Sequence, residues 1–177
     1  IPTTVVLTCT PPSITRTVVP ACPAGFGVDL DFTALGDGAP FSVTYNVNGV
    51  PQTPVAVNAI GLVSLTGFAN GDDVDVTVVH GNDTQCNVNF LNNTYYCPPA
   101  NDNCANAVLN TLDPSTSVTR TGNTFGATNA EGFGFGVTGV VWESFTLTEC
   151  VQTLVVQMCG TDPVHDFYWG PIYTDCS

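Results

Sequence analysis

Short stretches in which apolar and polar residues alternate constrain this chain more than any other feature. The runs 27–32, 41–47 and 73–78 alternate cleanly. Successive side chains point to opposite faces of a β-strand, so this period predicts half-buried strands rather than helices. The 25 Val and 25 Thr residues suit a pleated sheet, whereas Glu occurs 3 times, Met once and Lys never. The sequence therefore predicts an all-β fold.

Turn residues divide the chain into two expected units. Residues 1–98 hold seven or eight short strand-like runs separated by turn signals such as Asn48-Gly49, which is typical of an immunoglobulin-like β-sandwich. Proline and polar residues predict a stiff linker over 99–103. Residues 104–177 allow one or two helical turns at their start, then four or five strands, fewer than a sandwich needs. We expect two tandem β-sandwich units, the second short or strand-deficient: either the second unit is truncated or its missing strands come from outside the chain.

Charge excludes several partners. The chain has 15 acidic residues against 2 basic ones, Arg16 and Arg120, and a net charge of −13. Nucleic acids and anionic membrane surfaces are bound by clusters of Lys and Arg, which this chain cannot build, so we expect no nucleic-acid partner. No apolar run approaches the roughly 20 residues of a membrane-spanning helix, so we expect no membrane insertion. Because the chain begins at Ile1, we expect a processed chain or a piece of a longer one.

The cysteines predict a secreted or cell-surface protein. The chain has 8 of them, and no two are as close as the Cys-x2-Cys pairs of zinc sites. If each unit pairs its own four cysteines, nine sets of disulfide bonds are possible. A continuous strand between Cys150 and Cys159 would hold them about 30 Å apart, beyond the reach of a disulfide, so six sets remain. Among these we favour the following bridges: Cys9–Cys22, Cys86–Cys97, Cys104–Cys150 and Cys159–Cys176.

The residue patterns of common catalytic sites are absent. There is no Gly-x-Ser-x-Gly and no His-Glu-x-x-His. His80 and His165 are the only histidines, and we expect His80 to be exposed in a turn without an orienting partner. Glu143 and Glu149 would lie about 20 Å apart on one strand, too far for a glycosidase pair. We therefore expect that this protein is not an enzyme.

Acidic residues at one turn raise the alternative of a calcium site. Asp72, Asp73 and Asp75 are clustered there, and calcium prefers several loop oxygens. However, the Asp-x-Asp-x-Asp-Gly pattern is absent, and alternating Asp73 and Asp75 fit the solvent face of a strand. We expect no cofactor, with calcium as the weaker alternative.

A cluster near the C-terminus raises the alternative of glycan binding. Flat aromatic faces with polar edges stack on sugars, although a core or interface strand is the favoured interpretation of such a cluster. The residues concerned are His165, Phe167, Tyr168 and Trp169.

The absence of Lys bears on assembly. Exposed edge strands are usually guarded by charge, Lys especially, and edges rich in Val and Thr invite pairing with another chain. Together with the short second unit, this predicts self-association into a homopolymer through strand pairing.

Several segments resemble blocks of secreted multidomain proteins of Bacteroidota. Residues 101–108, 124–128, 141–146 and 159–162 are similar to one domain of those proteins, with Glu143 where that family often carries Tyr. In addition, residues 71–78 followed by Cys86 resemble the late strands of their immunoglobulin-like adhesin repeats. The resemblance implies an exported or cell-surface protein, often routed by type IX secretion, whose units serve as non-catalytic stalks, adhesive modules or filament parts. We therefore expect a structural or adhesive filament subunit, with a glycan-binding module of a secreted enzyme or adhesin as the alternative.

Overall fold

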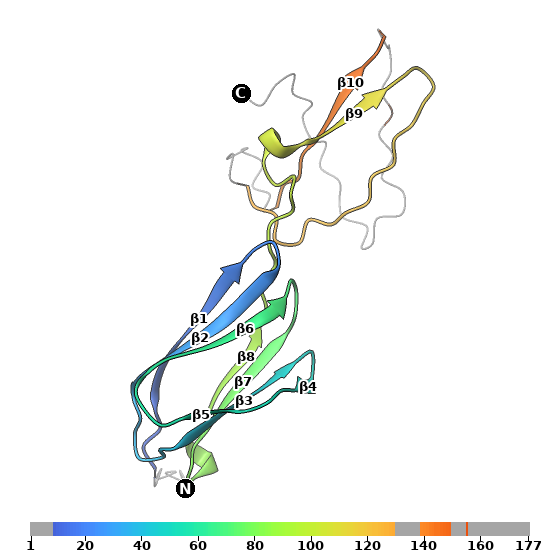
Figure 1. The fold of residues 1–177 in the computed structure, drawn as a ribbon. Coiled ribbons are helices and arrows are strands. Elements are labelled where there is room, and N and C mark those ends of the chain that lie inside the picture. The colour runs from blue at the N-terminus through green and yellow to red at the C-terminus, as the bar shows by residue number, and fades with distance from the viewer. Residues whose placement is uncertain (1–8, 130–138, 150–154, 156–177) are drawn as a thin grey trace, which may run out of the picture. The chain divides into compact units, whose positions relative to one another are not determined.

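The computed structural model describes residues 9–129, 139–149 and 155 (Figure 1). By its contacts the chain divides into two compact units, Ile1–Pro98 and Pro99–Ser177. The division lies beside the proline-rich stretch at which the sequence places the linker. The all-β prediction is confirmed: in the described ranges the helical elements are two single turns of 3-10 helix, η1 (Thr84–Cys86) and η2 (Cys104–Asn106).

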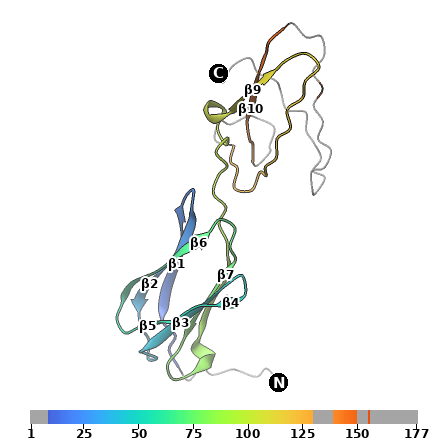
Figure 2. The same cartoon turned by 45° about the vertical axis from the view of Figure 1, so that its right-hand side comes forward.

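Two antiparallel sheets form the first unit (Figures 1 and 2). In sheet A the strand order is β1-β2-β6. In sheet B, β3 pairs with β7 on one side, and β7 pairs with β8. On its other side β3 pairs with the short strands β4 and β5. The bounds in sheet A are β1 (Ser13–Ala21), β2 (Gly25–Ala34) and β6 (Gly61–Ala69). Those in sheet B are β3 (Phe41–Val47), β4 (Val50–Pro51), β5 (Val55–Val57), β7 (Val74–Val79) and β8 (Val88–Asn93).

The core lies between these sheets and follows from the alternating sequence pattern. In β7, Val74, Val76 and Val78 are fully buried while the residues between them are partly exposed. The rings of Phe26 and Phe68 pack with centroids 5.4 Å apart. Each such buried side chain contributes about 1.5–3 kcal/mol relative to an exposed one. The cluster draws on both sheets and comprises Phe26, Val28, Leu30, Phe32, Phe41, Val43, Val57, Leu65, Phe68, Val74, Val76 and Val78.

Several local predictions meet different outcomes. The Asn48-Gly49 turn is confirmed, with positive φ values of 51° and 78°. Strand β1 was not anticipated, because Arg16 occupies one of its positions otherwise filled by apolar residues. Of the one or two helical turns allowed after residue 104, one is present as η2, and β9 (Val108–Leu112) follows at once. Residues 94–97, which follow β8, form no strand.

In the second unit the described residues include one two-stranded parallel sheet. It pairs β9 with β10 (Glu143–Leu147), in a register that places Glu143 beside Val108 and Leu147 beside Leu112. A complete or strand-deficient second sandwich stays a prediction.

The predicted disulfides of the first unit are wrong in their pairing. Cys9 bonds Cys86 and Cys22 bonds Cys97, with Cα atoms 6.1 and 5.6 Å apart. The reason is β1, which runs between Cys9 and Cys22 and holds them about 30 Å apart, beyond the reach of a bridge. Cys104 is also disulfide-bonded, whereas Cys150, Cys159 and Cys176 lie outside the described residues.

Candidate functional site

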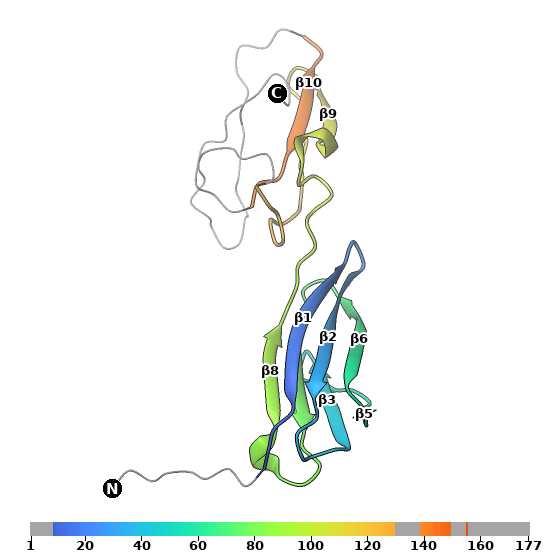
Figure 3. The ribbon, with the colours of Figure 1, turned by 90° about the vertical axis from the view of Figure 1, so that its left-hand side faces the viewer.

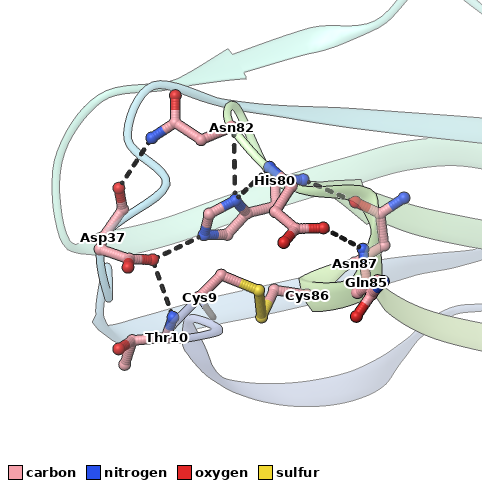
Figure 4. A network of polar contacts seen from close by, with 9 residues as sticks. Cys9, Thr10, Asp37, His80, Asn82, Gln85, Cys86 and Asn87 are labelled. Carbon is pink, nitrogen blue, oxygen red and sulfur yellow. Dashed lines mark hydrogen bonds and ion pairs between the residues drawn. A yellow bond between two sulfur atoms is a disulfide. The ribbon is translucent and has the colours of Figure 1, made fainter. Parts of the chain in front are cut away.

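The first candidate is a polar network around His80, drawn in Figure 4. The prediction that His80 is exposed is wrong: only 3% of the residue is accessible. Its Nε2 lies 2.9 Å from Oδ1 of Asp37, the orienting partner that sequence reasoning did not find. Its Nδ1 accepts hydrogen bonds from the backbone N–H groups of Asn82 and Asp83 at 3.3 and 3.1 Å. These contacts orient the ring, with Nδ1 toward the two backbone N–H groups and Nε2 toward Asp37.

This pair resembles a catalytic dyad in composition but not in access. General-base work requires a ring nitrogen that can take a proton from a bound molecule. In His80 both nitrogens are hydrogen-bonded within the protein, and the side chain is only 1% exposed. The hydrogen bonds of His80 therefore serve to position the loops that contain Asp37 and residues 82–83.

Asp37 ties the start of the described chain to this network. Its Oδ1 accepts a hydrogen bond of 2.8 Å from the N–H of Thr10, and its own N–H donates to the Thr10 carbonyl at 3.2 Å. The bond from Thr10 chiefly, and His80 to a smaller extent, lower the pKa of the Asp37 carboxyl against the opposing effect of desolvation. The Cys9–Cys86 bridge lies beside these bonds (Figure 4). The network and the disulfide therefore hold residues 9 and 10 against the loop that contains Asp37 and the loop that follows β7.

The acidic turn forms hydrogen bonds of its own. Asp72 accepts from the Asn48 side chain and from the N–H of Ala69, both at 2.7 Å. Asp75 accepts from the N–H of Asn92 at 2.9 Å, and the Asp73 carboxylate lies 3.5 Å from the Thr94 hydroxyl. These contacts join neighbouring hairpins. Within the described ranges no three Asp, Glu, His or Cys side chains are grouped as metal ligands would be.

In the second unit, hydrogen bonds join three of the four segments named for the resemblance; the fourth, 159–162, lies outside the described residues. Buried Asp102 accepts from the N–H and the hydroxyl of Thr128, at 2.5 and 2.7 Å. Asn101 and Trp142 are joined by hydrogen bonds of 2.8 and 2.9 Å. These bonds connect the regions 101–108, 124–128 and 141–146.

Arg120 closes a second polar cluster on the β9–β10 sheet. It donates to Oδ1 of Asn110 and lies 3.8 Å from Glu143. Asn110 in turn donates to the Ser144 carbonyl at 3.0 Å. This cluster links the two strands and accounts for one of the two arginines of the chain.

One lateral side of the first sandwich is closed by side chains. It is formed by β1 and β8, the outer strands of the two sheets, which lie side by side in Figure 3. Arg16 of β1 donates to Oδ1 of buried Asn93 on β8, whose amide donates to the carbonyls of Val74 and Phe90 at 2.6 and 2.7 Å. The two disulfides join the chain just before and just after these strands. We call this the guarded side.

The opposite lateral side carries no charge. It is formed by β4, β5 and β6, and no charged residue occurs between Asp37 and Asp72 in the sequence. Ile60 and Leu62 are 65% and 62% exposed there. Pro51 and Pro54 interrupt the part of this side that belongs to sheet B. We call this the uncharged side. The expectation of unguarded edges therefore applies to one side of the sandwich, because Arg16 protects the other.

Some predicted residues lie outside the described part of the chain. These are the four of the aromatic cluster: His165, Phe167, Tyr168 and Trp169. None of the helices in the described ranges is both long and apolar enough to span a membrane.

The comparisons with known proteins return no match. No family model, curated protein or solved structure matches this chain.

Proposed function

We propose that this chain is a non-catalytic, extracellular structural or adhesive protein whose copies join by strand pairing into a surface filament. The observation that carries the proposal is the difference between the two lateral sides of the first sandwich. The guarded side is held by two disulfides and the Arg16–Asn93 bond. The uncharged side has an outer strand without such protection, and exposed strand edges pair readily with other chains.

The disulfides support the extracellular part of the proposal. Such bonds persist in oxidising compartments and are rare in the cytosol. Two of them staple a unit of 98 residues at both ends of β1 and β8. A unit that is covalently held in this way suits a stalk or filament exposed to mechanical load and proteases.

Negative-stain microscopy of the purified chain, beside size-exclusion chromatography, tests the proposal. Ordered fibres that persist at physiological salt are the expected result. A folded monomer of about 18 kDa at every concentration would contradict the filament. Glycan arrays then test the alternative, a glycan-binding module that uses the cluster at residues 165–169.

A further inference from the structure

Within the part of the chain that the structure describes, strand β6 is paired on one side only. It pairs with β2 along Gly61–Ala69, and no other strand of the described residues pairs with it. Its outward-facing Leu62, Ser64 and Thr66 are all exposed. The strand contains neither a charged residue nor a proline. It therefore presents free backbone N–H and C=O groups without the usual deterrents.

A bulge limits the part of this edge that is regular. Val28 lies beside Leu65, but Phe26 lies beside Phe68, so Thr66 and Gly67 together oppose Gly27. Gly67 takes a φ of +86°, which favours glycine. The regular edge, meaning the part whose register with β2 is unbroken, is therefore Gly61–Leu65, although Gly61 at its start has a φ of +133°.

The other outer strands of the first unit are poor partners for this edge. β1 carries Arg16 at an inward position and Pro20 near its end, both of which deter pairing. β8 is tied to β1 through Asn93. β4 and β5 are two and three residues long. Among the outer strands of the first unit of a second copy, the one best suited to pair with β6 is β6 itself.

We propose that β6 is a dimerisation edge, which pairs antiparallel with β6 of a second copy about a twofold axis and joins two A sheets into one of six strands. This inference rests on the proposed function, and it identifies one of the contacts between copies in the proposed filament. Copies with a net charge of −13 repel each other, and β6 brings no charged residue of its own to the contact; Asp29 and Asp31 lie one strand away, on β2. A twofold contact closes on itself, so the filament requires a second, different contact.

The register follows from the regular edge. Full overlap of Gly61–Leu65 with its copy places the twofold axis at Val63. Leu62 of one copy then lies opposite Ser64 of the other, on the outer face of the joined sheet. Lys at both positions would place like charges directly across the contact, which disfavours pairing.

The fold offers a closely matched pair of variants. Leu62 and Ser64 of β6 lie beside Asp31 and Asp29 of β2. On the opposite side of β2, Thr15 and Thr17 of β1 lie beside the same two aspartates. The doubles L62K/S64K and T15K/T17K therefore add the same charge, next to the same carboxylates, at exposed positions of the two edges of one sheet.

Sedimentation equilibrium of the full chain, from micromolar to millimolar concentration, is the test. We expect wild type and T15K/T17K to dimerise, and L62K/S64K to dimerise at least about tenfold more weakly. Unfolding curves first establish that both variants are folded; should L62K/S64K unfold, the single variant S64K takes its place. A wild type that is monomeric throughout, or equal dimerisation of the two doubles, would overturn the inference.

Microscopy of the same samples separates this inference from the proposed function. Fibres that persist in L62K/S64K contradict β6 pairing and leave the filament standing. Dimers that depend on β6 but never form fibres support the pairing and contradict the filament.

Discussion

Gly38 shows how one residue supports the His80 network. A Cβ added at Gly38 would lie 2.2 Å from two ring atoms of His80, whose side chain is 1% exposed. Overpacking of this kind costs about 1–3 kcal/mol, so we expect Gly38→Ala to lower the free energy of unfolding by that amount. Urea unfolding followed by circular dichroism measures the loss.

Two controls test this explanation. Gly122→Ala should leave stability nearly unchanged, because an added Cβ there meets no atom within 4 Å. In a His80→Ala background the penalty of Gly38→Ala should largely disappear, since the ring that it meets is gone. A penalty that persists in that background would refute the proposed overlap.

Asp37 gives the network a defined pH dependence. Its carboxyl has a pKa below the ordinary 3.8, because the N–H of Thr10 and His80 favour the charged form. The stabilisation is therefore complete above that value and is lost as pH falls through the lower pKa of the folded state. We expect the stability difference between wild type and Asp37→Asn to be constant from pH 7 to about pH 5 and to shrink below pH 3.8. Urea titrations across this range measure it, and a difference that grows on acidification would contradict the assignment.

Strands β1 and β8 belong to different sheets, and the disulfides hold them together. The bridges close sequence separations of 77 and 75 residues. Removing a native disulfide from a small domain costs about 2–5 kcal/mol, so we expect C22A/C97A to lower the free energy of unfolding by an amount in this range. Unfolding in urea measures the cost.

Peptide mapping under non-reducing conditions checks the connectivity directly. It should recover the pairs Cys9–Cys86 and Cys22–Cys97. Recovery of Cys9–Cys22 would mean that β1 does not extend between these two cysteines.

The charge of the whole molecule makes association depend on salt. Copies at −13 repel over a screening length of about 10 Å at 0.1 M salt, which falls as salt rises. An uncharged contact should therefore strengthen with added sodium chloride, and sedimentation at low and high salt measures the change. Association that weakens with salt would indicate ion pairs at the interface, contrary to pairing through β6.

Strand positions were predictable where the local pattern is complete. Runs such as 41–47 alternate without interruption, and β3 has these bounds. β1 is not predictable in this way, because Arg16 stands where the pattern requires an apolar residue. Arg16 is accommodated there by its hydrogen bond to Asn93, which is 77 residues away in the sequence. The His80–Asp37 pair was missed in the same way, since the two residues are 43 positions apart.

The sequence by itself determined that this chain is all-β, acidic and disulfide-bonded, because period-two alternation, charge and cysteine content are local or additive properties. The tertiary structure alone decided which cysteines pair, which histidine is buried and which sheet edge is left unguarded. These depend on which strands become neighbours in space. Packing two sheets face to face brings β1 beside β8 and leaves β6 at an uncharged side, and no short stretch of sequence encodes that arrangement.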